Sequence, residues 1–413
     1  MKRCTVCHAL ILCLLCISPV AQSQLQKIYL HPKAAGSDKQ SNFVDSIRFI
    51  PLEVKAGIEL STYNYVEITK NYFYIPDYYR KAVHLYSKNG RFFKTINFKQ
   101  LGDAFYPVYD EYTNRIVFVE NNKNYSLTPK DRIKIMLDWD KPRNKKYFKK
   151  YAIDLNDTTF TIRKDVPQQN DILHASFFYS DIYYQGEIIT SGLFKDSLDY
   201  EFKTYQNNRF IKGFFPYNHV NEPRFLYTRE NISVNNTDTP AVNFIARPYC
   251  DTIYKTTGDS LYAAYQLVLP LENSLPASFF TRPFKNKTER ENFNRNNGWM
   301  LHQVYTFYET PRFVYFLVGY LSNYETYIYQ KQTNTTCKVK NIKPDSSQYN
   351  LQILVDFGIT RKGNRFYKLQ KAEDLLTFFE KNKNVPVPKE LESFLKSNPP
   401  AATPVIIEFK FKN

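Results

Sequence analysis

Apolar and polar residues alternate along much of the chain with a period of two, which is the spacing of a half-buried β-strand. The clearest early cases are residues 43–54, 65–75, 83–86 and 91–98. Asn89 and Gly90 separate the last two segments, and an Asn-Gly pair between apolar runs favours a tight hairpin turn. These segments predict a meander of about four short antiparallel strands.

Looser versions of this meander follow along the chain. Their segments are residues 115–120, 182–190, 200–214, 225–232, 242–245, 251–269 and 312–330. Repeated four-stranded meanders are typical of a β-propeller, in which each blade covers the faces of its neighbours. The spacing is irregular, and a pair of β-sandwich domains is the alternative that the pattern leaves open.

Helical spacing is confined to the C-terminal part of the sequence. Residues 372–381 and 388–395 carry it, with Pro388 at a first helical turn. Residues 404–412 then alternate again and predict a final strand. We expect an all-β fold with a short helical segment before this closing strand, and we expect residues 43–54 to complete a blade with the C-terminal strands.

Composition is consistent with a large β-rich protein. The 413 residues include 34 Tyr and 33 Phe, whose rings suit a pleated surface, but only 12 Gly. An apolar fraction of 43% excludes a wholly disordered chain. The formal net charge of +16 favours an anionic partner, such as a polysaccharide, lipid head groups or an acidic protein face.

The first residues have the pattern of a secretory signal peptide. Lys2 and Arg3 precede an apolar run over residues 9–17, and the small residues Ala21 and Ser23 occupy the third and first positions before Gln24. We therefore expect residues 1–23 to be removed during export to the periplasm or the cell exterior. A lipid anchor on Cys16 is disfavoured because the bulky Leu15 precedes it.

The rest of the sequence predicts a single domain. Residues 24–42 are polar and predict a mobile lead-in, and residues 43–413 contain no Ser/Gly linker and predict a single propeller domain. No later segment approaches the 18 consecutive apolar residues of a membrane span, so membrane contact would be peripheral.

Cleavage would leave two cysteines, Cys250 and Cys337. An exported chain allows a disulfide between them, and two unpaired thiols are the equal alternative. No C-x-x-C motif remains after cleavage, which excludes a zinc ribbon or a thioredoxin-type redox site.

Several short motifs resemble one family. They are the strand at residues 46–53 ending in Ile-Pro-Leu-Glu, the strand and hairpin at residues 71–75 and 83–92, the Asp-Thr-Ile-Tyr segment within residues 250–265, and Asn-Pro-Pro at 398–400 before the final strand. Together they resemble the secreted six-bladed β-propellers of Gram-negative envelopes, which are distantly similar to NHL-type propellers. The resemblance implies a six-bladed ring and export, and it carries over no catalytic residues.

The sequence contains no recognisable catalytic or metal motif. It lacks a G-x-S-x-G elbow, H-E-x-x-H, a Walker A loop and a dinucleotide fingerprint. The five histidines beyond residue 23 do not pair at metal-ligand spacing; they are His31, His84, His174, His219 and His302. The paired acids Asp138 and Asp140 suit a solvated turn better than catalysis. We therefore assign no catalytic residue, no metal ligand and no cofactor.

Three stretches combine aromatic rings with cations and are candidate binding sites. They comprise Tyr78, Tyr79 and Arg80 at a predicted turn; Arg143, Lys145, Lys146 and Tyr147; and Arg282, Lys285 and Trp299. Such stretches can hold anions and stack on rings, although solvated loops have the same composition. Exported proteins seldom meet nucleic acid, so we expect none as a partner.

The sequence thus predicts an exported, non-enzymatic binding or scaffold protein whose propeller-face loops hold an envelope protein or glycan. This expectation rests partly on the family resemblance, because a fold does not fix a function. The alternative is a metal-dependent hydrolase or lyase with its site in the central channel. A third possibility is an envelope component whose basic surface docks on anionic lipid.

Overall fold

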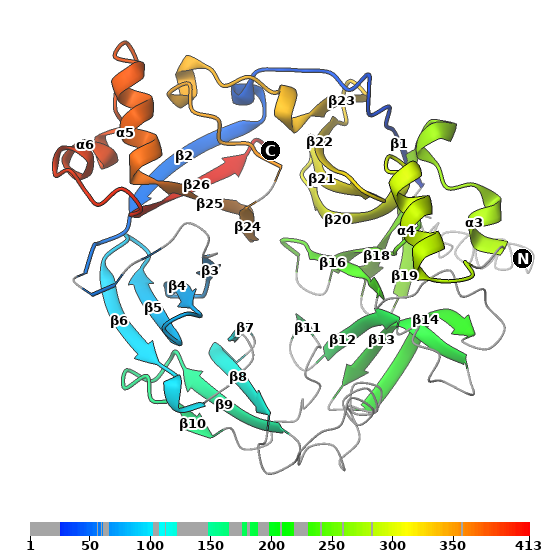
Figure 1. Ribbon diagram of the computed structural model, residues 1–413, viewed down its shortest axis with the longest axis horizontal. Coiled ribbons are helices and arrows are strands. Elements are labelled where there is room, and N and C mark those ends of the chain that lie inside the picture. The colour runs from blue at the N-terminus through cyan, green and yellow to red at the C-terminus, as the bar shows by residue number, and fades with distance from the viewer. Residues whose placement is uncertain are drawn as a thin grey trace, which may run out of the picture.

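The structure of the chain is a computed structural model. It describes residues 25–413 apart from residues 56, 59, 61–65, 102–106, 112, 122–147, 165–175, 180–181, 189–197, 207–208, 219–229, 240–241, 258–259, 282–283 and 357. Within these residues the strands form six sheets, which stand around a common centre (Figure 1). We number these sheets as blades 1 to 6.

Blades 1 to 3 follow one another along the chain, and each begins at its inner strand (Figure 1). Blade 1 consists of β3 (Glu67–Ile68), β4 (Tyr72–Asp77), β5 (Ala82–Ser87) and β6 (Phe92–Asn97). Blade 2 consists of β7 (Val108–Asp110), β8 (Arg115–Asn121), β9 (Phe148–Asp154) and β10 (Arg163–Lys164). Blade 3 consists of β11 (Ser176–Tyr179), β12 (Ile182–Ile188), β13 (Leu198–Gln206) and β14 (Arg209–Asn218), with β15 (Glu230–Asn231) paired to β12.

Blades 4 to 6 complete the ring. Blade 4 consists of β16 (Ser233–Asn236), β17 (Val242–Ala246), β18 (Thr252–Thr257) and β19 (Ser260–Val268). Blade 5 consists of β20 (Leu301–Glu309), β21 (Phe313–Tyr320), β22 (Tyr324–Gln330) and β23 (Thr335–Lys338). Blade 6 consists of β24 (Ile359–Lys362), β25 (Arg365–Lys371), β26 (Pro404–Phe411) and the N-terminal strand β2 (Val44–Pro51).

The ring closes where the two ends of the domain meet. Strand β2 pairs antiparallel with β26, from Val44 opposite Phe411 to Pro51 opposite Val405. The predicted pairing of residues 43–54 with the C-terminal strands is therefore confirmed. Because β2 covers the outer edge of β26, blade 6 has four strands, as blades 1, 2 and 5 do.

The segment before β2 is an ordered strap, so the prediction of a mobile lead-in at residues 24–42 is wrong for the part that the structure describes. Strand β1 (Gln26–Tyr29) pairs in parallel with β19 of blade 4. Gly36 bridges Cys337 in blade 5, and Lys39 bridges Lys343. A 3-10 helix, η1 (Gln40–Asn42), then leads into β2. We call residues 26–43 the strap; with β2 it links blades 4, 5 and 6 along the outside of the ring (Figure 1).

Hydrogen bonds of the Gln40 side chain explain why this polar segment packs against the ring. Its side chain is fully buried, and its amide nitrogen donates to Gln348 Oε1 at 2.8 Å and to the Leu351 carbonyl at 2.9 Å. Its amide oxygen accepts from the backbone amides of Ile353 at 2.8 Å and Leu354 at 3.0 Å. All four partners lie about 300 residues further along the chain, beyond the reach of a local sequence pattern.

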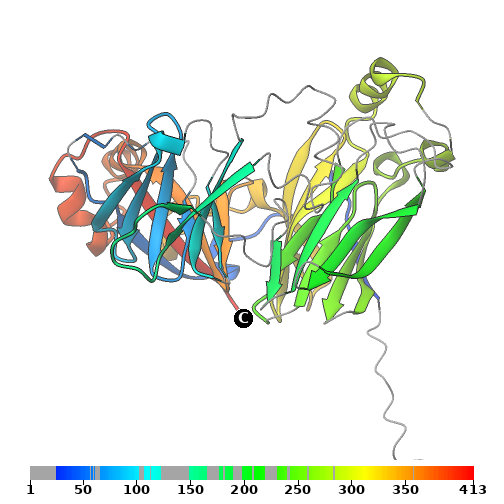
Figure 2. The same ribbon diagram turned by 90° about the horizontal axis from the view of Figure 1, so that it is seen from below.

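The helices lie outside the ring. Helices α5 (Ala372–Lys381) and α6 (Lys389–Lys396) connect β25 to β26 as predicted, and their buried leucines join the core of blade 6. Further 3-10 turns are η2 (Lys99–Leu101), η4 (Leu271–Asn273), η5 (Val339–Asn341) and η6 (Ser346–Gln348). Figure 2 shows α5 and α6 at one edge of the ring and α3 (Ala277–Thr281) and α4 (Lys287–Asn296) at the opposite edge.

Helices α3 and α4 correct the prediction that helical structure is confined to the C-terminal part. The Asn286 side chain caps α4 by accepting from the Glu289 amide at 2.9 Å, and the Glu289 carboxylate accepts from the Lys285 amide at 2.6 Å. Few apolar residues mark this helix, but Phe293 packs beside Phe279 of α3. In the described part of the chain, no helix is both long and apolar enough to cross a membrane.

Candidate functional site

A groove of about 730 Å³ lies on the outside of the ring where blade 6 meets blade 1. Its floor is the segment 51–54 that leaves β2, and its walls are the β5–β6 turn and the loop after α6. Its lining residues are Pro51, Leu52, Glu53, Val54, Asn89, Gly90, Arg91, Phe394, Ser397, Asn398, Pro399 and Pro400. This volume is within the range of sites that hold small molecules or short chain segments.

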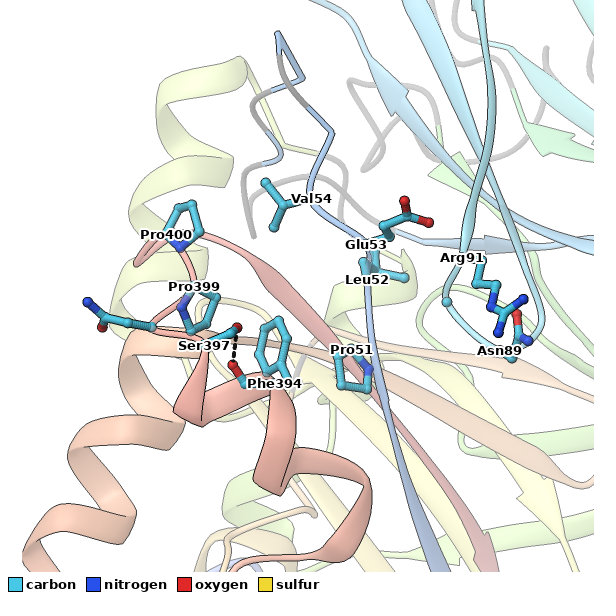
Figure 3. Close-up of a pocket in the computed structure, with 12 residues that line it drawn as sticks. Pro51, Leu52, Glu53, Val54, Asn89, Arg91, Phe394, Ser397, Pro399 and Pro400 are labelled. Atoms are coloured by element: carbon cyan, nitrogen blue, oxygen red, sulfur yellow. Dashed lines mark hydrogen bonds between the residues drawn. The ribbon is translucent and has the colours of Figure 1, made fainter.

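The wall from the C-terminal helices is mainly apolar. Figure 3 shows the ring of Phe394 between Pro51 and Pro399, with Val54 beside Pro400. Val54 is 48% exposed, so it offers apolar surface to a partner. The Ser397 hydroxyl donates to the Phe394 carbonyl at 2.7 Å and so caps the last turn of α6 beside the groove.

The opposite wall is polar and is built on the predicted Asn-Gly turn. Gly90 has a φ of 84°, and a Cβ there would lie 2.1 Å from the Pro51 carbonyl oxygen, so only glycine fits. The Glu53 amide donates to the Gly90 carbonyl at 2.9 Å, and the Glu53 carboxylate accepts from the Phe92 amide at 2.9 Å. Figure 3 shows Glu53, Asn89 and Arg91 on this side, so the groove presents an acid, a base and an amide opposite an apolar wall.

The structure does not bring the sequence-predicted binding residues together. Tyr78, Tyr79 and Arg80 form the β4–β5 turn; Tyr79 is fully exposed, whereas Arg80 pairs with the buried Asp77 at 3.1 Å. Lys285 is exposed just before α4, on the far side of the ring from blade 1 (Figure 1). Trp299 is 45% exposed and packs on Tyr320 with 5.4 Å between ring centroids. None of these residues lines the groove.

The other candidates fall outside the described residues. These are Arg143, Lys145, Lys146, Tyr147 and Arg282. Their role stays a prediction. The groove itself was missed because its three segments are far apart in sequence, and only the Asn-Gly turn gave a local signal.

The disulfide that the sequence allowed is not formed. Both Cys250 and Cys337 are free. Cys250 lies just before β18 in blade 4, whereas Cys337 is buried in β23 of blade 5, where it joins the core cluster of blade 6 and the strap. Burial raises the pKa of the Cys337 thiol, which makes it a poor nucleophile.

A histidine, an acid and a hydroxyl are also aligned in blade 1. His84 Nδ1 lies 2.9 Å from the Thr95 hydroxyl, and its Nε2 lies 3.7 Å from the Asp77 carboxylate. The His84 side chain is buried, and burial lowers the pKa of its imidazole although Asp77 opposes this change. The three side chains project from β4, β5 and β6; the His84–Thr95 contact links β5 to β6, whereas His84 Nε2 has no hydrogen-bond partner among the described residues.

Metal binding gains no support from the described residues. Among them, no group of three or more His, Cys, Asp or Glu side chains could hold an ion. The metal-dependent enzyme therefore stays an alternative from the sequence alone.

Comparison with known families decides where this fold belongs. A family model described as a 6-bladed beta-propeller, DUF5128, matches residues 21–367. The chain belongs to the DUF5128 family. The six-bladed propeller that the sequence motifs implied is thereby confirmed, and the two-sandwich alternative is wrong.

Solved structures resemble this DUF5128 protein in fold at low sequence identity. A Bacteroides fragilis protein described as exported matches with a TM-score of 0.55 and 13% identity, over 94% of this chain and 100% of that chain. A DUF4221 family member from Bacteroides vulgatus matches with a TM-score of 0.40 and 13% identity, over 91% and 100% of the two chains. No curated protein matches the chain. The first likeness supports the propeller fold.

Proposed function

We propose that this DUF5128 protein is an exported, non-enzymatic binding protein that holds an envelope protein or glycan at its surface. Export is supported by the signal-peptide pattern of residues 1–23 and by the likeness to a Bacteroides fragilis protein described as exported. We expect cleavage before Gln24 and release to the periplasm or the cell exterior without a lipid anchor.

The groove between blades 6 and 1 is the observation that carries this proposal. It joins an apolar wall, with Phe394 and Pro399, to a polar wall with Asn89 and Arg91, over a floor that carries Glu53 and Val54. Binding sites commonly combine apolar contact area with a few convergent polar groups that fix orientation. The groove is also framed by rigid elements, the Gly90 turn and the capped end of α6, which reduces the entropy lost on binding.

Two sets of variants test this role with the mature protein. Immobilised envelope polysaccharide and immobilised envelope protein serve as two separate probes in a surface-binding assay. Val54→Asp and Arg91→Ala alter the groove, whereas Tyr79→Ala and Lys285→Ala alter exposed residues elsewhere. We expect one probe to bind and the groove variants to weaken binding at least about tenfold, while the other two variants bind as the wild type does.

The possible outcomes distinguish whether the protein binds at all from whether it binds at the groove. Failure of both probes to bind would contradict a binding role. Normal binding by the groove variants, with loss in Tyr79→Ala, would move the site to the β4–β5 turn that the sequence singled out. Thermal unfolding of each variant confirms that the changes act on binding and not on folding.

A further inference from the structure

A second cavity lies beside blade 4, on the opposite side of the ring from the groove (Figure 1). Its volume is about 360 Å³, which is within the range of small-molecule sites. The end of β19 and the turn before β18 form one side, and Ser274, Leu275 and Phe280, which lie before and within α3, form the other. We call the space between them the blade 4 pocket.

The pocket exists because the connection between blades 4 and 5 is long. Residues 269–300 separate β19 from β20 and contain α3 and α4. This connection has a small apolar core, in which Phe279 packs on Tyr249 of blade 4 with 5.0 Å between ring centroids. Long connections in compact domains usually either carry a function or lack order. This one folds onto blade 4 and leaves a cavity at the junction.

Much of the pocket wall is apolar. Leu267 and Leu269 line it from the end of β19, Leu301 from the start of β20, and Leu275 and Phe280 from the connection. Leu267 and Leu301 are buried, whereas Phe280 is 41% exposed. Binding removes apolar surface from water, so this wall favours a ligand with a hydrocarbon body.

Asp251 adds a negative charge to this apolar wall. Among the described residues that line the pocket, it is the one with a formal charge. Its carboxylate accepts from the Thr252 hydroxyl at 3.0 Å and from the side-chain amide of Gln266 at 3.1 Å. Both donors are neutral, and no cation pairs with Asp251 in the described part of the chain. Because a carboxylate has about four acceptor positions, Asp251 can accept further hydrogen bonds from a ligand.

Two arginines on neighbouring elements are engaged with other groups. Arg247 forms two hydrogen bonds with Glu201 of blade 3, at 2.7 Å and 2.5 Å. Arg290 of α4 donates to the Tyr249 hydroxyl at 2.7 Å. Neither arginine lines the pocket, so the charge that a ligand meets at the wall is that of Asp251.

We propose that the blade 4 pocket binds a small primary amine with an apolar body. The ammonium group donates to Asp251, and the apolar body lies against Phe280 and the leucines. A hydrogen bond between an ammonium and a carboxylate is stronger than one between neutral groups, which sets the amine apart from an alcohol or an acid of the same shape. The site is separate from the groove and does not depend on the proposed function.

Calorimetric titration of the mature protein with phenethylamine, at neutral pH and low salt, tests this site. Two probes of matched shape are 2-phenylethanol, which is neutral, and phenylacetate, which is negatively charged. Phenethylamine should bind at least about tenfold more tightly than either of them. Equal binding of the amine and the alcohol, or no binding of the amine, would overturn the proposal.

Variants assign this preference to residues. Asp251→Asn keeps the shape of the side chain and should remove the preference for the amine over the alcohol. The control, Asp45→Asn on an exposed residue of β2, makes the same change in net charge and should keep it. Phe280→Ala should weaken the binding of amine and alcohol by similar factors. An unchanged preference in a folded Asp251→Asn protein, checked by thermal unfolding, would contradict the assignment.

Cys250 gives a readout that needs no variant, because it lines the pocket and forms no disulfide. Phenethylamine should slow the alkylation of Cys250 by iodoacetamide, read by mass spectrometry, and phenylacetate should leave the rate unchanged. Absence of protection by phenethylamine at a saturating concentration would place its binding outside the pocket and overturn the proposal.

A further probe tests whether the amine is a small molecule. The tripeptide amide Phe-Gly-Gly-NH2 carries the same ring and an ammonium group at a peptide N-terminus. Weaker binding of this peptide than of phenethylamine would support a small amine as the ligand. Tighter or equal binding would overturn that choice in favour of a protein N-terminus.

Discussion

Replacing Gln40 by alanine should destabilise the propeller far more than its place in a polar segment suggests. The substitution removes four hydrogen bonds, two donated by the side chain and two accepted by it. It also leaves the amides of Ile353 and Leu354 without acceptors in the interior. At about 1 kcal/mol for each bond, the free energy of unfolding should fall by about 4 kcal/mol.

Equilibrium urea unfolding, followed by circular dichroism, measures this loss. Lys39→Ala is the matched control, because it changes the preceding, exposed residue of the same strap and should cost less than about 0.5 kcal/mol. Native-state hydrogen exchange adds a local readout: the amides of Ile353 and Leu354 should exchange faster in Gln40→Ala. A fall of less than about 1 kcal/mol in the free energy of unfolding, with unchanged hydrogen exchange at these two amides, would contradict the burial of Gln40 described here.

Two further predictions concern single buried groups. Burial raises the pKa of Glu325, but hydrogen bonds from Lys338, Tyr327 and Lys340 outweigh burial and hold that pKa below its usual value. The stability that the Glu325 carboxylate adds should therefore be present above about pH 4.5 and be lost as the pH falls through the lower pKa of the folded state. The free energies of urea unfolding of Glu325→Gln and the wild type should accordingly become equal in acid. Titration with a thiol reagent should find two free thiols in the unfolded mature protein, with Cys250 reacting before Cys337 in the native protein; a single band of disulfide-linked peptides would contradict this.

Local patterns predicted the elements whose partners are nearby in sequence. The alternation around Val83 and the turn at Gly90 predicted the hairpin of blade 1, and the spacing of Leu375 and Phe379 predicted α5 with its observed bounds. The pairing of β2 with β26 was also predicted, because a closed ring leaves no exposed edge for either strand.

The missed features depend on distant partners or on caps. The sequence alone indicates that Gln40 is exposed to solvent, because the hydrogen bonds that bury it are made to residues near position 350. Helix α4 lacks an apolar stripe, and its signal was the cap at Asn286 followed by Glu289.

The pairing of β2 with β26 also determines when the ring can close. During synthesis β2 emerges early, but its partner strand is made last, at residues Pro404–Phe411. Until then Phe49 and Ile50, which are buried in the finished protein, have no strand to cover them. Such long-range pairing slows folding and exposes apolar surface to aggregation. Closure of the propeller therefore waits until Pro404–Phe411 has been made, and residues 44–51 have no partner strand before that point.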